Sequence, residues 1–308
     1  MRQEDAMGNT VGVIGLGNMG GAMAQNLLAA GFEVLGLDID SERMAAFTAQ
    51  GGKPAASPGE VTHEADVVVL SLPNVAALEQ VVYGPGGLVE AGRAGVICVE
   101  TGTFPLSAKV AAAAALAERA IALLDCTVSG TGSQARDRDI VLYTSGPVDQ
   151  VARCEPVFAA ISRAAPRVGE FGAGSTMKFV SNLLVAVHTV AAAEALTLAA
   201  KCGLDLGSTL ELISAGAGNS RMLQVRGPLM VAGEYDVASA TLDTLTKDTK
   251  IIRDFAEEHQ CPVPMLSVAA VLLNAASAQG HHDLDPAVVK EVLAGLAGMP
   301  TPVASGQE

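Results

Sequence analysis

In residues 10–28 the chain reads TVGVIGLGNMGGAMAQNLL, and this stretch decides the fold. A short apolar run ends in the pattern G-x-G-x-x-G at Gly15, Gly17 and Gly20, and a helix-forming segment follows. The glycines permit a tight strand-to-helix turn and let the backbone approach a pyrophosphate, whose charge the N–H groups at the helix start can hold. Three spaced glycines also occur in ordinary turns, so the flanking sequence must support a dinucleotide site.

A second apolar run, Glu33–Leu37, supplies that support. It ends in Asp38, about twenty residues after the glycines, where an acid can bind the hydroxyls of the adenine ribose. A carboxylate would repel a 2′-phosphate, and no arginine adjoins Asp38, because Arg43 lies on the next expected helix. We therefore expect NAD, with NADP less favoured. Alternatively, Asp38 only caps that helix, which would leave the cofactor choice open.

The composition is that of a soluble globular protein. Its 308 residues are enough for two domains, and 50% of them are hydrophobic. Lys and Arg number 19 against 33 Asp and Glu, without a basic run, which argues against nucleic acid and anionic membranes as partners. Aromatic residues make up only 3% and Trp is absent, so platforms for stacking bases are missing as well.

The cysteines favour a reducing compartment. There are 5, an odd number, and none forms a C-x-x-C pair, so we expect neither disulfides nor a metal site in a cytoplasmic protein. The polar start of the chain shows no export signal. The apolar stretch from Phe179 to Ala200 is interrupted by polar side chains such as Asn182 and Glu194, which favours a buried central helix over a membrane span.

Apolar runs alternate with helical patterns from residue 10 to about 168. Strands are expected at Val11–Ile14, Val34–Leu37, Val67–Leu70, Val96–Val99, Ile121–Leu124 and Asp139–Ser145, with a last short one around Arg167. The helical stretches between them are Gly20–Ala30, Glu42–Gln50, Val75–Val82, Pro105–Ala120 and Val148–Ile161. This alternation with short connections predicts an α/β fold, a Rossmann-type doubly wound parallel sheet.

After the glycine-rich segment 169–174 the strand signals stop. Helices are expected at Ser175–Cys202, Leu206–Ala215, Asn219–Ala232, Ala240–Gln260, Val263–Gln279 and Pro286–Ala297, so a C-terminal all-α domain follows. We divide the chain into a disordered N-terminus (1–9), an NAD-binding domain (10–170), a helical substrate and dimerisation domain (171–300) and a frayed tail (301–308). The active site is expected in the cleft between the two domains.

Two polar residues share one face of the first long helix. Lys178 and Asn182 lie one turn apart in an otherwise apolar pattern. Desolvation would lower the pKa of such a lysine toward the working range of a general acid or base. The alternative is a lysine that reaches water along the surface, with an asparagine that bonds a loop; spacing alone does not separate the two.

The segment Asp125–Ala135 follows an expected strand and is rich in small and hydroxyl-bearing residues. Its backbone N–H groups are suited to bind a carboxylate. The alternative is an ordinary loop.

Four motifs in order resemble the β-hydroxyacid dehydrogenase family, over residues 10 to about 298. They are Gly15–Gly20, Asp125–Ala135, Gly174–Asn182 and Lys247-Asp248. The resemblance implies that Lys178 is the general acid and base, that Asn182 orients the substrate, and that the substrate carboxylate binds at Ser129 and Gly130. Thr131, the next residue, is a further candidate for substrate binding. It also implies these cofactor-binding residues: Gly15, Leu16, Gly17, Asn18, Met19, Gly20, Asp38, Leu72, Pro73, Thr103 and Lys247.

The chain departs from the family pattern at three places. The substrate motif usually reads D-x-P-V-S-G-G, whereas here Thr127 replaces the proline and Thr131 the second glycine. Gly102 stands where a serine commonly precedes the threonine that matches Thr103. These departures leave the identity of the substrate open.

A further segment resembles the Gly-Asn-Ser turn of family members that handle polyhydroxylated acids. From it we expect Asn219 and Ser220, and with them Arg221, to contact the distal end of the substrate.

The resemblance implies an NAD-dependent dehydrogenase of small hydroxy acids, assembled as a homodimer or homotetramer. Imine reductases share the architecture but typically lack the lysine at the position of Lys178. A cofactor-binding interaction module without catalysis is the alternative from another class, and it would be expected to lose Lys178 and Asn182.

Overall fold

The computed structural model describes residues 9–236 and 240–299, and these form two compact units, one up to Lys178 and one from Phe179. The expectations for the chain ends, a disordered segment 1–9 and a frayed tail 301–308, fall outside the described residues, apart from Asn9.

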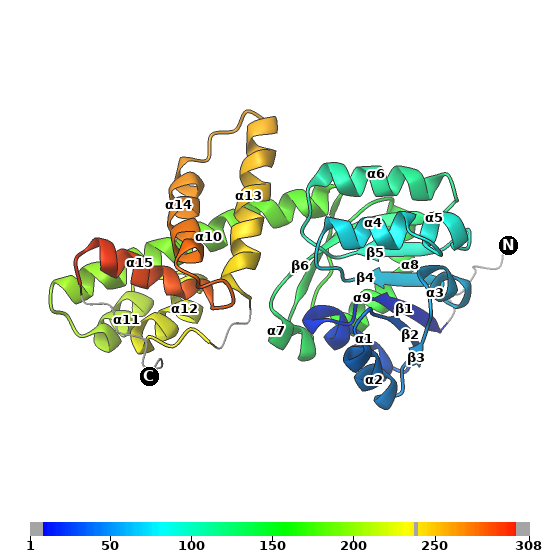
Figure 1. Ribbon diagram of the computed structural model, residues 1–308, viewed down its shortest axis with the longest axis horizontal. Coiled ribbons are helices and arrows are strands. Elements are labelled where there is room, and N and C mark those ends of the chain that lie inside the picture. The colour runs from blue at the N-terminus through cyan, green and yellow to red at the C-terminus, as the bar shows by residue number, and fades with distance from the viewer. Residues whose placement is uncertain (1–8, 237–239, 300–308) are drawn as a thin grey trace. The chain divides into compact units, whose positions relative to one another are not determined.

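The first unit is built on one sheet, with the strand order β3-β2-β1-β4-β5-β6-β7-β8 (Figure 1). The strands are β1 (Thr10–Ile14), β2 (Glu33–Leu37), β3 (Lys53–Pro54), β4 (Val67–Leu70), β5 (Ile97–Glu100), β6 (Ala122–Ser129), β7 (Val141–Ser145) and β8 (Arg167–Gly169). All pairs are parallel except β6 with β7, which is antiparallel, so the sheet is mostly parallel. The doubly wound Rossmann-type architecture is confirmed.

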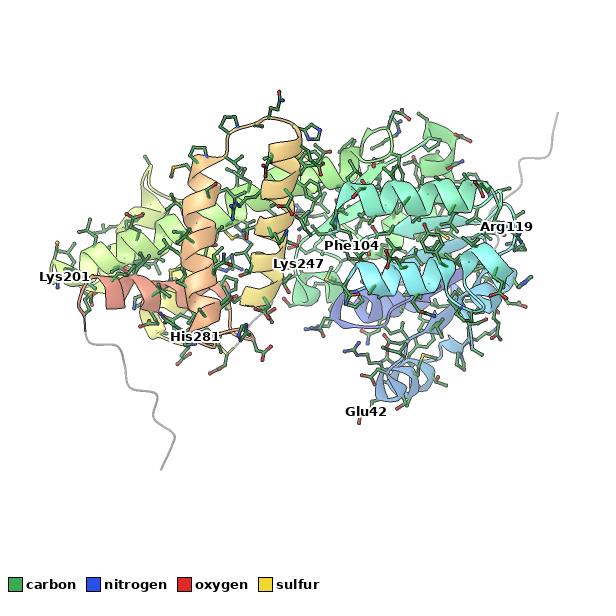
Figure 2. All side chains as sticks on the ribbon, turned by 45° about the horizontal axis from the view of Figure 1, so that its top comes forward. Glu42, Phe104, Arg119, Lys201, Lys247 and His281 are labelled. Carbon is green, nitrogen blue, oxygen red and sulfur yellow. The ribbon has the colours of Figure 1, made fainter. Side chains whose placement is uncertain are left out.

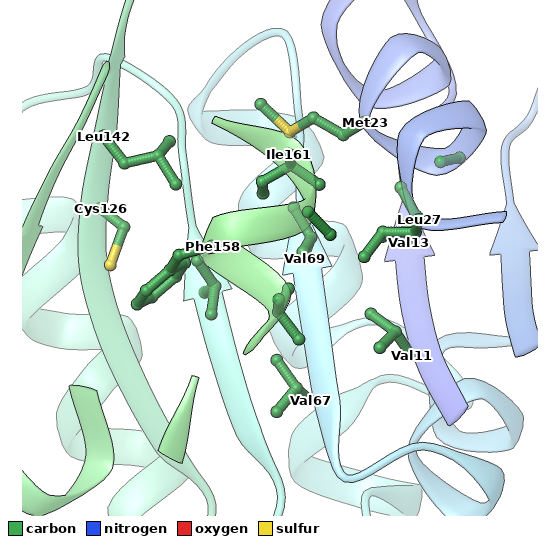
Figure 3. Close-up of a cluster of buried hydrophobic side chains, with 14 of the residues drawn as sticks. Val11, Val13, Met23, Leu27, Val67, Val69, Cys126, Leu142, Phe158 and Ile161 are labelled. Carbon is green, nitrogen blue, oxygen red and sulfur yellow. The ribbon is translucent and has the colours of Figure 1, made fainter. Parts of the chain in front are cut away.

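Helices cover both faces of this sheet. They are α1 (Asn18–Ala29), α2 (Ser41–Ala49), α3 (Pro58–Glu64), α4 (Val75–Tyr83), α5 (Leu88–Ala91), α6 (Leu106–Ala117), α7 (Gly132–Arg136), α8 (Val148–Arg153) and α9 (Glu155–Ile161). One face packs Val67 and Val69 of β4 against α1 and α9, as Figure 3 shows. The other face packs Val68 and Leu70 against α3 to α6. This alternation along a fully buried strand explains why its sequence is uniformly apolar.

Several short elements of this unit were not predicted. The segments β3, α3, α5 and α7 are too short to show a periodic apolar pattern. The helix expected over Val148–Ile161 is divided at Cys154, because Pro156 at the start of α9 has no N–H to continue the hydrogen bonding of α8.

Strand β6 is longer than predicted. Its expected end was Leu124, but it continues through Asp125 to Ser129 by pairing with β7, with Asp125 opposite Ser145 and Ser129 opposite Val141. The prediction that the segment from Asp125 onward follows the strand is therefore wrong for Asp125 to Ser129. Polar Asp125 and Thr127 concealed the strand, although both are completely buried.

The second unit is helical. Helix α10 (Ala173–Lys201) begins in the first unit and continues into the second, which also contains α11 (Leu206–Ala215), α12 (Arg221–Ala232), α13 (Leu242–Glu258), α14 (Pro264–Ala278), the 3₁₀ turn η1 (Pro286–Val288) and α15 (Val289–Leu296). Helix α12 starts two residues later than predicted because the Ser220 hydroxyl caps it. The apolar core of this unit includes Ala186 and Leu196 of α10.

Candidate active site

The glycine turn has the tight geometry that its sequence predicts. Gly15 has φ of +91°, and a Cβ there would lie 2.2 Å from the Ser71 carbonyl oxygen. A Cβ on Gly20 would lie 1.9 Å from the Gly15 oxygen. Neither position admits a side chain. Gly17 is the N-cap residue of α1, and within the described residues no side chain caps this helix. The first N–H groups of the twelve-residue helix therefore remain available for an anion.

Asp38 lies beside this turn. One carboxylate oxygen accepts a hydrogen bond from the Leu16 N–H at 2.6 Å and the other from the Asp40 N–H at 2.9 Å. Helix α2 is capped by Asp40, so the alternative that Asp38 merely caps this helix is wrong. The Arg43 guanidinium lies 3.7 Å from the Asp38 carboxylate and 3.3 Å from that of Asp40.

These features fit NAD. The missing side chains at Gly15 and Gly20 leave room for backbone approach, the uncapped start of α1 suits a pyrophosphate, and the oriented Asp38 carboxylate suits ribose hydroxyls. Leu16 is buried at the start of the turn, while Asn18 and Met19 open α1. The predicted cofactor residues of the first unit named so far thus lie together at the carboxyl ends of β1 and β2.

Leu72, Pro73 and Thr103 belong to the same edge of the sheet. They follow the carboxyl ends of β4, which pairs with β1 on the side opposite β2, and of β5, the next strand beyond it. The strand order reverses direction between β1 and β4, which is the position where doubly wound sheets bind ligands. The Leu72 side chain would lie 3.4 Å from a Cβ on Gly15, so this loop adjoins the glycine turn.

The end of β6 adjoins the glycine turn as well. A Cβ on Gly132 would lie 3.1 Å from the Asn18 Cβ, which brings the loop of Ser129, Gly130 and Thr131 next to the start of α1. Gly130 has φ of +142° and packs on Ile140, so only glycine fits comfortably. The predicted carboxylate-binding loop and the predicted cofactor turn are therefore neighbours within one unit.

Thr131 forms a capping box with Gln134. Its hydroxyl accepts the Gln134 N–H, and the Gln134 side chain accepts the Thr131 N–H at 3.0 Å. Thr127 donates to the Gly174 carbonyl oxygen at 2.7 Å. Both threonines that depart from the family pattern thus make specific hydrogen bonds at positions where proline and glycine could not.

Lys178 is half-buried on α10, three residues after Ser175. The Ser175 N–H and hydroxyl both donate to the Asp125 carboxylate, at 2.7 and 2.9 Å. Residues three apart on a helix share a face, so Ser175 is the neighbour of Lys178 one turn back. The start of the helix that carries Lys178 is bonded to β6.

Sequence analysis missed a buried ionic cluster beneath this turn. The Lys109 ammonium lies 2.5 Å from Glu100 and 2.8 Å from Asp125, and all three side chains are fully buried. Burial disfavours the charged lysine, but the two carboxylates outweigh it and raise the pKa of Lys109, whereas burial raises the pKa of Glu100. The sequence did contain a sign of this cluster, because Glu100, Lys109 and Asp125 are charged residues within otherwise apolar strand and helix patterns.

In the second unit, Asn182 and Asp248 form a buried pair. The Asn182 amide nitrogen donates to one Asp248 oxygen at 2.7 Å, and the Lys247 ammonium lies 3.1 Å from the other. Lys247 is partly exposed on α13 and is labelled in Figure 2. This pair orients the Asn182 amide, a role for Asp248 that sequence analysis did not assign.

Asn219 and Ser220 lie between α11 and α12. The Asn219 amide nitrogen donates to the Ser214 carbonyl at 2.9 Å, and the Ser220 hydroxyl oxygen accepts the Leu223 N–H. The Asn219 oxygen is buried and has no hydrogen-bond partner in residues 9–236 and 240–299. Arg221 is exposed at the start of α12.

Residues 9–236 and 240–299 contain no group of three or more His, Cys, Asp or Glu that could hold a metal ion. Within the same ranges α10 alone is long and apolar enough to cross a membrane, and 44% of its most apolar part is buried inside the protein.

Comparison with known proteins agrees with this geometry. Residues 10–172 match the family described as the NAD binding domain of 6-phosphogluconate dehydrogenase, and residues 172–293 match that described as NAD-binding of NADP-dependent 3-hydroxyisobutyrate dehydrogenase. L-threonate dehydrogenase of Cupriavidus necator is 36% identical over 94% of this chain and 98% of its own.

Solved structures extend the comparison. The 3-hydroxyisobutyrate dehydrogenase from Salmonella typhimurium has a TM-score of 0.83 and 31% identity, over 92% of this chain and 99% of that one. The imine reductase from Pseudomonas sp. has a TM-score of 0.61 at 18% identity, over 92% and 99%, which shows a shared fold alone.

The glycine turn, Asp38 and the matching families define an NAD-binding oxidoreductase that acts on CH–OH groups. The chain belongs to the β-hydroxyacid dehydrogenase family. The alternative reading as an imine reductase is not favoured.

Proposed function

We propose that this protein oxidises the β-hydroxyl of a small hydroxy acid that carries further hydroxyl groups, with NAD as cofactor and Lys178 as general acid and base. One observation carries the proposal: Ser175, one turn before Lys178, is bonded to the strand whose end carries Ser129 and Gly130. The proton-transferring side chain and the carboxylate-binding loop thus share one support. The chemistry that NAD supplies when bound is acceptance of a hydride from the carbon bearing the hydroxyl.

Lys178 handles the proton of this reaction. In the oxidation its neutral amine takes the proton from the substrate hydroxyl, while the C–H electron pair leaves as hydride and a carbonyl forms. In the reverse direction its ammonium returns that proton to the carbonyl oxygen. A half-buried position allows proton exchange with solvent while limiting access of water to the reacting groups.

The substrate carboxylate is assigned to the loop of Ser129 and Gly130, with Thr131 closing it. Thr131 is fixed by Gln134, so the loop is preorganised. Asn182, oriented by Asp248, is assigned to hold the substrate near Lys178, since both lie on one face of α10.

The distal end of the substrate is assigned to Asn219 and Ser220. The Asn219 acceptor oxygen lacks a partner in the described part of the chain, and a hydroxyl is the group that would satisfy it. The Ser220 oxygen is already bonded to the Leu223 N–H, which leaves its proton to donate. The relative from Cupriavidus necator is named for L-threonate, an acid of this type.

Assembly and location are proposed alongside. Helix α14 packs Leu266 and Leu273 inward, yet Met265, Val268 and Val271 are 60–65% exposed on another face. An apolar helix surface of this kind supports a homodimer or homotetramer.

A cytoplasmic location is proposed from the cysteines. We further propose an NAD-binding domain up to about residue 170 and a helical substrate domain after it, a division that the two family matches support.

NADH formation with L-threonate and 3-hydroxyisobutyrate tests the function, with NADP in parallel. We expect turnover with NAD and a preference for L-threonate. The Asn219→Ala variant should raise KM for L-threonate about tenfold and leave 3-hydroxyisobutyrate unaffected, because only the first acid carries the extra hydroxyls. Tight NADH binding without turnover of any hydroxy acid would instead indicate the non-catalytic interaction module.

A further inference from the structure

We propose that the buried network of Lys109, Asp125 and Ser175 is a positioning device that fixes the first turn of α10 and thereby sets the place of Lys178. The inference rests on the proposed function, since it assigns these residues to act through the catalytic lysine. None of them is a catalytic residue.

Asp125 is the centre of the network. Its carboxylate accepts hydrogen bonds from the Ser175 N–H at 2.7 Å, the Ser175 hydroxyl at 2.9 Å and the Lys109 ammonium at 2.8 Å, and a longer one from the Ser145 hydroxyl at 3.4 Å. The Ser175 N–H belongs to the first turn of α10, where a negative charge is stabilised by the helix dipole. Asp125 therefore caps α10 through Ser175, a residue 50 positions later in the chain.

Lys109 holds Asp125 in place. Its ammonium also forms an ion pair with Glu100 at 2.5 Å and donates a hydrogen bond to the Gly102 carbonyl at 2.7 Å. Phe104, labelled in Figure 2, lies beside the ammonium, 5.8 Å from nitrogen to ring centroid. The carboxylate that meets Ser175 thus cannot rotate without breaking a buried ion pair.

Backbone packing leaves the turn no freedom. The Gly174 N–H donates to the Ser145 hydroxyl, which donates in turn to the Asp125 carbonyl. A Cβ on Gly174 would lie 2.4 Å from that same carbonyl oxygen. The helix start therefore rests directly on β6 and β7, and Thr127 adds a hydrogen bond to the Gly174 carbonyl.

Stability alone does not account for such a cluster. Burying charges is expensive, and well-packed apolar residues of similar volume often stabilise a protein as well or better. Ion pairs and hydrogen bonds differ from apolar contacts in that they fix the orientation of the groups they join. Proton transfer requires near-exact placement of the donor, and a shift of about 1 Å can cost on the order of 100-fold in rate.

The Ser175→Ala variant tests the proposal. It removes one hydrogen bond to Asp125 and keeps the backbone N–H, and we expect kcat to fall about tenfold with little change in KM or in NADH affinity. Thr176→Val is the matched control, because the Thr176 hydroxyl in the same turn donates to the carbonyl of Gly172, the residue before the helix, and does not contact Asp125. The control should keep kcat within about twofold.

A double variant distinguishes positioning from other roles. If Ser175 acts only through Lys178, then adding Ser175→Ala to Lys178→Ala costs nothing further; independent losses that multiply would overturn the proposal. Unchanged kcat in Ser175→Ala, beside an inactive Lys178→Ala, would also overturn it while leaving the proposed function standing. Full activity of Lys178→Ala would refute the function itself.

A second variant covers the case in which Ser175→Ala does not fold. Thr127→Val removes only the hydrogen bond to Gly174 and keeps the side-chain volume. We expect a smaller fall in kcat in the same direction, again absent in the Lys178→Ala background. A fall of equal size in that background would contradict the proposal.

Discussion

At the scale of single residues, Lys178 gives the most direct prediction. The Lys178→Met variant keeps the length of the side chain but removes its proton, so kcat should fall about 10²- to 10⁴-fold. NADH binding, followed by fluorescence titration, should change less than about twofold, because the cofactor residues of the first unit remain intact. Retention of more than a tenth of the wild-type kcat would be inconsistent with a general acid and base.

Asp38 governs the choice of cofactor. The Asp38→Ser variant removes the charge that repels a 2′-phosphate and releases Arg43, which now lies between Asp38 and Asp40. The ratio of kcat/KM for NADP to that for NAD should rise at least about tenfold, equivalent to about 1.4 kcal/mol. Replacing Arg43 by Ala in the same background should cancel the gain. If this ratio is the same in Asp38→Ser as in the wild type, the Asp38 carboxylate does not select NAD over NADP.

Individual residues differed in how far sequence could predict them. The glycines and Asp38 could be predicted from the sequence because their roles depend on residues that are close together in the chain. Lys109 and Asp125 did not, since their contacts join β5, β6, α6 and α10, and single-sequence patterns carry no information on such distant pairs. Asp248 as partner of Asn182 was missed for the same reason.

At the scale of elements, the contact of α10 with the sheet edge gives a stability prediction. In Gly174→Ala the new Cβ would lie 2.4 Å from the Asp125 oxygen and 2.5 Å from that of Tyr143, so we expect a loss of about 1–3 kcal/mol in the free energy of unfolding. Gly295 in α15 is the control, with nothing within 4 Å of an added Cβ.

The Gly295→Ala variant should gain no more than about 0.5–1 kcal/mol, because alanine is favoured over glycine in a helix and Gly295 lies in the last turn of α15. Urea unfolding of both variants measures these changes. Equal stability of Gly174→Ala and the wild type would mean that the start of α10 is free to move away from β6.

Long elements were predicted well and short ones poorly. The strands β1, β2 and β4 and the helices α11, α13 and α14 appear within a few residues of their expected bounds, because apolar periodicity specifies them. Strand β6 was cut short at Leu124, since burial of Asp125 and Thr127 depends on partners from β7 and α10. The antiparallel direction of β7 could not be derived from its composition.

At the scale of the whole molecule, the exposed apolar face of α14 predicts self-association. The wild-type protein should have the mass of a dimer or tetramer by light scattering. Val268→Lys places a charge on a residue that is 60% exposed, and should shift the mass toward the monomer at micromolar concentration. Glu257→Lys, an exposed polar position on α13, should leave the mass unchanged. A monomeric wild-type protein would remove the proposal of assembly.

The capping box of Thr131 and Gln134 has a consequence for protein engineering. Each side chain accepts a hydrogen bond from the backbone N–H of the other residue. The two positions therefore depend on each other and should be exchanged together. A chimera that receives the substrate loop of a relative with glycine at position 131, but keeps Gln134, would leave the Gln134 backbone N–H without the hydroxyl that accepts it. Exchanges of substrate preference between members of this family should therefore transplant residues 129–136 as a block.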